Sequence, residues 1–295
     1  MNEKTTRNIL VTGTNSGLGR ATAETLARDG HNVFASMRGV GSKNLGAVRE
    51  LEALAEKEDL DLEVVELDVT EQESVDAAIS RILDAAGHLD VVVNNAGAGS
   101  VGVLEGFTME QVQHIFETNA FGALRVNKAV LPSMRERGSG LLIHVSSTAG
   151  RVQVPFVSPY SAAKAALEAM AEELSFELAP FGVESVIVEP GTFATAGFGK
   201  LRSPADESVI SEYGELATKP REMFAGLTAA FEDPQMVARA DPQLVADATR
   251  TLIDTPAGER PLRTVVGTIT VEGVAELNET YAAIKKKMLV SLGAA

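Results

Sequence analysis

Short apolar segments rich in β-branched residues alternate with longer segments of helical periodicity along most of this chain. This alternation is typical of a parallel β-sheet whose strands are joined by helices lying on both faces. Two of the segments carry the runs VVV (91–93) and LLIHV (141–145), as expected for strands that are buried on both sides. The sequence therefore predicts a doubly wound α/β fold.

The expected elements follow one another in this alternating order. Strands are expected at Ile9–Thr12, Asn32–Ala35, Glu63–Leu67, Val91–Asn94, Leu141–Val145, Ser185–Val188 and Arg263–Gly267. Helices are expected at Arg20–Arg28, Ser74–Ala85, Met109–Met134, Pro159–Leu178, from Asp241 to about Asp254, and at Glu272–Leu289.

The segment Thr192–Gln235 departs from this order, because glycine, proline and charged residues are mixed there with aromatic ones. The aromatic residues are Phe193, Phe198, Tyr213, Phe224 and Phe231. We expect an insertion with short helices rather than an independent unit. Residues 1–295 are accordingly predicted to form a single domain.

Composition excludes several classes of protein. The 41 acidic residues against 26 basic ones give a net charge of −15, which argues against nucleic-acid or anionic-membrane partners. Because the chain has no cysteine, disulfides and thiolate chemistry are excluded, and its four scattered histidines predict no metal site. No segment reaches the roughly 18 apolar residues that span a bilayer, and no signal-peptide pattern is present. A cytoplasmic protein is expected.

A glycine-rich turn follows the first predicted strand and precedes a helical segment. It comprises Gly13, Asn15, Ser16, Gly17, Leu18 and Gly19. Such a turn can serve close packing alone, but between a strand and a helix it brings backbone amides and a helix N-terminus to a pyrophosphate. The turn therefore predicts a dinucleotide site.

Tyr160 and Lys164 are spaced i, i+4 and so share one face of a predicted helix. A free phenol has a pKa of about 10, and a neighbouring ammonium lowers it toward the range where a proton can be exchanged at neutral pH. A second pair with this spacing, Tyr281 and Lys285, is interpreted as a solvated helix face. His144, inside a predicted strand, is interpreted as a core residue with satisfied hydrogen bonds.

Together these features resemble the short-chain dehydrogenase/reductase family over about residues 8–192. The resemblance is carried, in order, by the TGxxxGxG turn, Asp68 in LDVT, the sequence Asn94-Asn95-Ala96-Gly97, Asn119, Ser147, Tyr160-Ser161-Ala162-Ala163-Lys164, and Pro190-Gly191. It implies a Rossmann-type fold and an oxidoreductase that transfers hydride between a nicotinamide cofactor and a ketone or secondary alcohol.

The resemblance also implies catalytic roles. Tyr160 would be the general acid or base, and Ser147 would hold the substrate oxygen. Lys164 would tune the tyrosine and bind the nicotinamide ribose, while Asn119 would order a water molecule beside it.

The cofactor is predicted to be NADP. At the end of the second strand, where an NAD-binding chain usually has a carboxylate, this one has Arg38, whose guanidinium suits a 2′-phosphate. Within the family an arginine here implies NADP, although the glycine turn lacks the basic residue often found there. The predicted cofactor-binding residues are Gly13, Asn15, Ser16, Gly17, Leu18, Gly19, Arg38, Asp68, Val69, Asn95, Ala96, Gly97, Tyr160, Lys164, Pro190 and Gly191.

The segment 192–235 corresponds to the family's substrate lid. With Val152, Val154 and Phe156 it indicates an apolar carbonyl or alcohol substrate. The family further implies a homodimer or homotetramer. Two alternatives remain open: a protein that senses NADP without catalysis, and a lyase built on the same fold.

Overall fold

The computed structural model describes residues 5–195 and 200–293, and Phe198 of the predicted aromatic set lies outside them. In these residues seven parallel strands form one sheet in the order β3-β2-β1-β4-β5-β6-β7. The strands are β1 (Asn8–Thr12), β2 (Asn32–Met37), β3 (Leu62–Glu66), β4 (Val91–Asn94), β5 (Gly140–Val145), β6 (Val183–Pro190) and β7 (Arg263–Val266). The predicted fold class and all seven predicted strands are confirmed.

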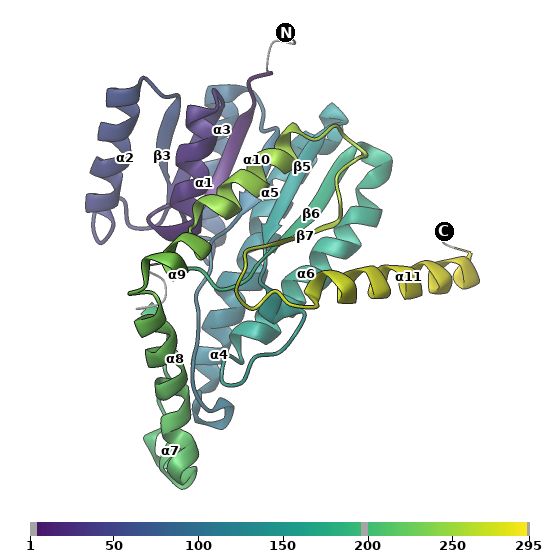
Figure 1. The fold of residues 1–295 in the computed structure, drawn as a ribbon. Helices are drawn as coiled ribbons and strands as arrows, with labels where there is room; N and C mark the ends of the chain where they lie inside the picture. The colour runs from purple at the N-terminus through teal and green to yellow at the C-terminus, as the bar shows by residue number, and fades with distance from the viewer. Residues whose placement is uncertain (1–4, 196–199, 294–295) are drawn as a thin grey trace.

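Eleven α-helices and several short helical turns are described (Figure 1). The α-helices are α1 (Gly17–Arg28), α2 (Leu45–Glu58), α3 (Gln72–Ala86), α4 (Met109–Phe116), α5 (Gly122–Arg137), α6 (Tyr160–Glu177), α7 (Glu207–Glu212), α8 (Lys219–Ala230), α9 (Pro234–Arg239), α10 (Gln243–Asp254) and α11 (Val274–Leu292). The short turns are η1 (Leu104–Gly106), the π-helical η2 (Glu117–Phe121), η3 (Thr148–Gly150), η4 (Ala179–Phe181) and η6 (Gly214–Thr218).

Two apolar layers hold the sheet between its helices. One layer joins β-strand side chains such as Val11 and Val93 to Leu26 of α1, Leu51 of α2 and Leu252 of α10. The other layer packs α3 and α5 against the opposite face. Side chains therefore alternate between two buried faces, which explains the near-continuous apolar runs in the sequence.

Three helical predictions need correction. The helix α2 was not predicted, and only Val48 and Leu51 of it are buried. The predicted helix Met109–Met134 is divided into α4, η2 and α5, because residues 117–121 wind as a π-helix. The catalytic-helix prediction placed Pro159 in the first turn, whereas α6 begins at Tyr160 with Pro159 as its N-cap.

Two parts of the chain project from the sheet and its covering helices. The helices α7 and α8 form an arm on one side, and α11 extends on another (Figure 1). The arm lies within the predicted insertion 192–235 and has the short helices expected there. Within the described ranges no helix has both the length and the apolar character needed to cross a bilayer.

Candidate active site

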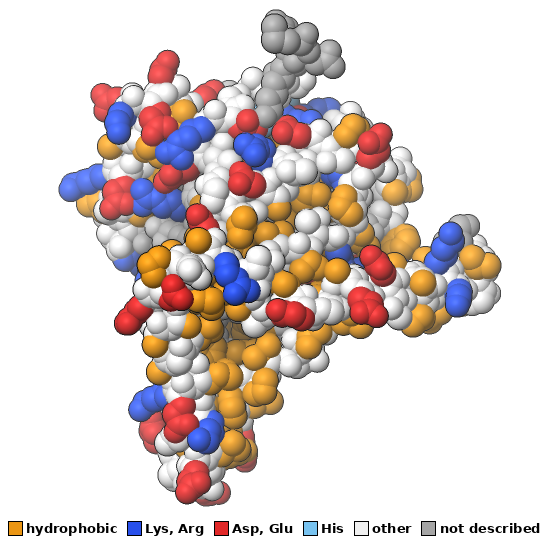
Figure 2. Space-filling model, in the orientation of Figure 1, with side chains coloured by type: hydrophobic (Ala, Val, Ile, Leu, Met, Phe, Trp, Pro, Cys, Tyr) orange, Lys and Arg blue, Asp and Glu red, His pale blue; other side chains and the backbone are white. Residues whose placement is uncertain are grey.

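A cavity of about 990 Å³ lies at the carboxyl ends of the strands, where β1 and β4 are neighbours and the strand order reverses. Hydrophobic side chains gather in the hollow between the α7–α8 arm and the body (Figure 2). Every residue predicted to be catalytic or cofactor-binding lines this cavity. These residues are Gly13, Asn15, Ser16, Gly17, Leu18, Gly19, Arg38, Asp68, Val69, Asn95, Ala96, Gly97, Asn119, Ser147, Tyr160, Lys164, Pro190 and Gly191.

The glycine turn is fastened to the loop that follows β4. Thr12 Oγ1 accepts hydrogen bonds from the backbone amides of Asn95 and Ala96, each at 3.0 Å, and Asn95 Nδ2 donates to Thr12 O at 2.8 Å. Gly13 has φ +74°, and a Cβ there would lie 2.8 Å from the Ala96 Cα. Glycine is therefore required where the two loops meet.

The N-terminus of α1 opens into the cavity directly after this turn. Among the described residues no side chain caps it, and its first turn contains no acidic residue. Its first amides and the positive end of its dipole thus remain available at the cavity wall. These residues fit the pyrophosphate of a dinucleotide.

A basic and amide-rich corner lies beside β2. Arg38, Lys43, Asn44 and Asn15 all line the cavity there. Asn44 Nδ2 donates to Arg38 O at 2.6 Å, and Asn15 Nδ2 donates to Asn44 Oδ1 at 3.4 Å. Lys43 and Asn44 are not among the predicted residues, although a lysine five residues after Arg38 is a signal for a second cationic group.

Asp68 faces the same corner. Its Oδ1 accepts hydrogen bonds from the amide and hydroxyl of Thr70, at 3.0 and 2.8 Å, and its Oδ2 lies 3.4 Å from Arg38 Nη1. Burial raises the pKa of Asp68, but these hydrogen bonds and the charge of Arg38 outweigh burial and leave the pKa below its usual value. Asp68 is thus an anion that orients Arg38.

Ser147, Tyr160 and Lys164 meet at the centre of the cavity. Burial raises the pKa of Tyr160, and the neighbouring Ser147 hydroxyl opposes the rise. Lys164 Nζ donates to Val145 O at 2.7 Å and lies 5.8 Å from the Tyr160 ring centroid. Burial lowers the pKa of Lys164 to about 8, against the opposing charge of Glu168. Lys164 is therefore a cation below about pH 8 and loses its proton as the pH rises through that value.

Asn119 is held in the π-helical turn η2 beside this group. Its Nδ2 donates to Ala98 O and Ile115 O, both at 2.8 Å, and its Oδ1 accepts from Ala98 N at 3.2 Å. A Cβ on Gly97 would lie 2.9 Å from Asn119 Oδ1 and 3.8 Å from Lys164 Nζ. The side chains of Asn119 and Lys164 therefore both lie beside Gly97.

The remaining wall is mostly apolar and comes partly from α8. The apolar residues on this side include Val154, Val157, Phe193, Met223, Phe224 and Leu227. Of the three residues predicted after the catalytic strand, Val154 lines the cavity, whereas Val152 and Phe156 are not part of its wall. His114 and Arg202 also line the cavity, and no motif in the sequence indicated them.

His144 was expected to be a satisfied core residue, and this is only partly correct. It is 1% exposed, and burial lowers its pKa to about 3, with Lys164 adding to the effect. However, neither ring nitrogen has a hydrogen-bond partner in the described part of the chain. The imidazole is buried and neutral, but it is not satisfied.

The interpretation of Tyr281 and Lys285 as a solvated face needs correction. The Tyr281 ring lies beneath the guanidinium groups of Arg151 and Arg263, 4.7 and 5.5 Å from its centroid. Lys285 pairs with Glu172. The pair packs against the body because this face of α11 meets a buried group of charges.

One group of side chains among the described residues brings potential metal-ligating atoms within 4.8 Å of one another: Asp29, His31 and Asp254. It lies outside the cavity wall, and His31 Nδ1 accepts a hydrogen bond from Arg7 N at 3.3 Å. The expectation that catalysis needs no metal stays a prediction.

A parallel sheet with a glycine turn and a Ser-Tyr-Lys group in one cleft defines a dinucleotide-dependent oxidoreductase. The family model described as short chain dehydrogenase matches residues 7–206. Retinol dehydrogenase 8 from Bos taurus is 37% identical over 254 residues, which cover 82% of this chain and 78% of that protein.

Two solved structures are also similar. A short-chain dehydrogenase from Streptomyces avermitilis is 35% identical with a TM-score of 0.77, covering 99% of this chain and 100% of that one. An actinorhodin polyketide ketoreductase with NADPH is 28% identical with a TM-score of 0.73, covering 92% and 99%. The chain belongs to the short-chain dehydrogenase/reductase family. It is accordingly an oxidoreductase that uses a nicotinamide cofactor and acts on a small molecule.

Proposed function

We propose that this chain is an NADP-dependent carbonyl reductase or alcohol dehydrogenase in which Tyr160 exchanges the proton. The observation that carries the proposal is that Ser147, Tyr160 and Lys164 line the same cleft as the glycine turn, with Lys164 Nζ 5.8 Å from the Tyr160 ring centroid. A phenol of this kind can give a proton to a carbonyl oxygen or take one from an alcohol.

The chain's own residues account for orientation and proton transfer. The bound nicotinamide supplies the hydride for reduction or accepts it in oxidation. Ser147 donates a hydrogen bond to the substrate oxygen and keeps it within reach of Tyr160. Burial raises the pKa of Tyr160, and the Ser147 hydroxyl opposes that rise. The Lys164 ammonium, 5.8 Å from the Tyr160 ring centroid, would favour the phenolate form of the bound enzyme. Asn119 fixes the backbone beside Lys164, where a water molecule would relay the proton to solvent.

The basic corner beside β2 supports NADP. Arg38 and Lys43 line it together, and a 2′-phosphate would receive charge-assisted hydrogen bonds from both. The ketoreductase with NADPH, which shares the fold and 28% of its sequence with this chain, supports the same cofactor.

The apolar wall supports an apolar ketone or secondary alcohol as substrate. Residues 192–235 would close over it as a lid, with Met223, Phe224 and Leu227 in contact. The similarity to retinol dehydrogenase 8, whose name specifies an apolar alcohol, agrees with this substrate class.

On composition and family resemblance, we further propose that residues 1–295 form a single domain of a cytoplasmic protein. We also propose that the protein is a homodimer or homotetramer, and native mass spectrometry would test the number of subunits.

Titration with NADPH and NADH, followed by nicotinamide fluorescence, tests the cofactor assignment. The wild-type protein should bind NADPH more tightly, and Arg38→Gln should weaken NADPH binding about 10- to 100-fold, because one charge-assisted interaction is worth roughly 1.5–3 kcal/mol. NADH binding should change less than about twofold.

Arg49→Gln is the matched control, since Arg49 is exposed on α2 and outside the cavity. A variant at Arg38 that binds both dinucleotides like the Arg49 control would contradict the NADP assignment. Failure of the wild-type protein to bind either dinucleotide would contradict the proposed function itself.

A further inference from the structure

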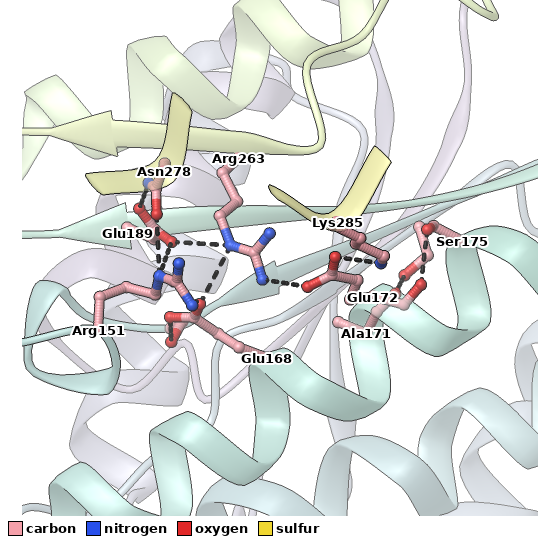
Figure 3. Close-up of polar contacts among 11 residues, drawn as sticks. Arg151, Glu168, Ala171, Glu172, Ser175, Glu189, Arg263, Asn278 and Lys285 are labelled. Atoms are coloured by element: carbon pink, nitrogen blue, oxygen red, sulfur yellow. Dashed lines mark hydrogen bonds and ion pairs between the residues drawn. The ribbon is translucent and has the colours of Figure 1, made fainter. Parts of the chain in front are cut away.

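A buried group of charges lies behind the cavity, where α6, β6, β7 and α11 meet (Figure 3). Three carboxylates, from Glu168, Glu172 and Glu189, face three cations, from Arg151, Arg263 and Lys285. Glu189 and Glu168 are 0% and 2% exposed. Burying ionised groups costs free energy unless each is paired with an opposite charge. We therefore expect this group to serve a purpose other than stability.

Glu168 is the member that faces the active site. Its Oε1 accepts a hydrogen bond from Ser146 Oγ at 2.7 Å, and both side chains are buried. Its Oε2 lies 3.3 Å from Arg263 Nε and 3.8 Å from Arg151 Nε. One carboxylate oxygen therefore binds the hydroxyl of Ser146, the residue before Ser147, and the other faces the two arginines.

The position of Glu168 beneath the turn η3 is sterically tight. A Cβ on Gly150 would lie 2.9 Å from Glu168 Oε1, 3.1 Å from Ser146 Oγ and 3.2 Å from the carbonyl carbon of Lys164. Glycine at residue 150 thus lets the turn after Ser147 lie directly on α6. The carboxylate sits where the serine segment and the tyrosine–lysine helix are in contact.

Glu168 also lies one helical turn after Lys164 on α6, the spacing that places two side chains on one face. Its negative charge opposes the lowering of the Lys164 pKa by burial. The other titratable neighbours of Lys164 are His144 of β5, which is neutral with a pKa of about 3, and Tyr160, whose pKa is raised by burial. Among these neighbours, Glu168 is the one whose charge opposes the effect of burial on Lys164.

We propose that Glu168 is a positioning residue for catalysis: it fixes the Ser147 segment against the helix of Tyr160 and Lys164, and its charge faces Lys164 from one turn below. This inference rests on the proposed function, since it assigns Glu168 to the same site. The arginines on its second oxygen hold the carboxylate in place, and Asn278 of α11 in turn accepts from Arg151 Nε at 2.9 Å and donates to Glu189 at 2.6 Å.

Two variants separate the charge of Glu168 from its hydrogen bond. Glu168→Gln removes the charge, whereas Ser146→Ala removes the hydrogen bond and keeps the charge. Glu173→Gln is the matched control, because Glu173 is exposed on the same helix. For each protein, competitive labelling of Lys164 followed by mass spectrometry gives the lysine pKa without any turnover, and steady-state assays give kcat and KM.

Glu168→Gln should lower the Lys164 pKa by about one unit, the lower end of the shift that an adjacent opposite charge produces. It should also lower kcat about tenfold and leave the KM for the cofactor within twofold, because a misplaced serine segment costs transition-state stabilisation rather than cofactor binding. Ser146→Ala should lower kcat several-fold with the Lys164 pKa unchanged.

Equal Lys164 pKa values in Glu168→Gln and Glu173→Gln would overturn the role of the charge, and equal kcat values would overturn the positioning role. If Glu168→Gln does not fold, the kcat of Ser146→Ala decides the positioning role. If Glu168→Gln lowers the Lys164 pKa but Tyr160→Phe leaves turnover unchanged, the electrostatic link between Glu168 and Lys164 stands and the proposed function is refuted.

Discussion

The chain contains two Tyr-x-x-x-Lys pairs, and their surroundings differ. Tyr160 and Lys164 lie in the first turns of α6 and line the cavity together with Ser147, and the lysine is buried and donates to Val145 O. Tyr281 and Lys285 lie on α11, where Tyr281 is 39% exposed and its ring lies beneath two arginines.

The comparison shows what a sequence spacing can and cannot specify. The i, i+4 interval places both side chains of each pair on one helix face. What that face meets decides the chemistry: a cavity with a serine hydroxyl in the first pair, and the carboxylate of Glu172 together with the Phe176 ring in the second. The first pair lies in the wall of the cavity, whereas the second joins α11 to α6.

Conservative removal of the two hydroxyls should have the largest differential effect. Tyr160→Phe should lower kcat for ketone reduction about 10³-fold, within the range expected for loss of a general acid. Tyr281→Phe keeps the ring under the arginines and should retain kcat within about twofold. Steady-state assays with NADPH check both, and similar losses in the two variants would remove the functional distinction between the pairs.

The pH dependence of kcat/KM should give the second largest difference, this time between Lys164 and Lys285. Because burial lowers the pKa of Lys164 to about 8, its positive charge is present below that pH and is lost above it. The kcat/KM for NADPH should therefore fall above pH 8, approaching tenfold per pH unit. Lys285→Met should leave this fall in place. A profile that stays flat to pH 10 would show that Lys164 keeps its proton or is not needed.

The smallest expected effect is on the stability of the fold, and it should come from substitution in the Tyr281–Lys285 pair. Lys285→Met removes a partly buried partner of Glu172 and should cost about 1 kcal/mol, or a fall in Tm of about 2 °C. Burial raises the pKa of Glu172, but its bonds to Arg263 and Lys285 outweigh burial and lower it below 4.5.

The stabilisation by Lys285 is therefore present above that pH and is lost as the pH falls through the lowered value. Calorimetry should find the Tm difference between wild-type protein and Lys285→Met at pH 7 and a smaller one below pH 4. A Tm difference that is larger in acid would contradict the pairing.

The sequence was informative where function depends on short, local patterns. The strands could be predicted because their side chains are buried on both faces, and the glycine turn because its residues are contiguous. Tyr160 and Lys164 share one helix face for the same local reason. Ser147 and Asn119 needed the family resemblance, because nothing in their own segments says that the fold brings them to Lys164.

Other features could not be predicted because they depend on contacts between distant segments. The charge group joins residues 151, 168, 172, 189, 263 and 285, which come together only when β6 and β7 pair and α11 packs on α6. Helix α2 buries just two apolar side chains, so its periodicity was weak. The π-helical turn at 117–121 breaks a segment whose apolar pattern reads as one helix.

That π-helical turn sets the phase of a long helical run. Asn119 and Asn127, eight residues apart, anchor to the end of β4 and the segment after it: Asn119 donates to Ala98 O, and Asn127 accepts from Asn94 Nδ2 at 2.8 Å. In an uninterrupted α-helix they would point about 80° apart, and one extra residue in the π turn reduces this to about 20°. If the same eight-residue interval wound as a regular α-helix, the two anchors would be out of phase, and the run could keep one of them but not both.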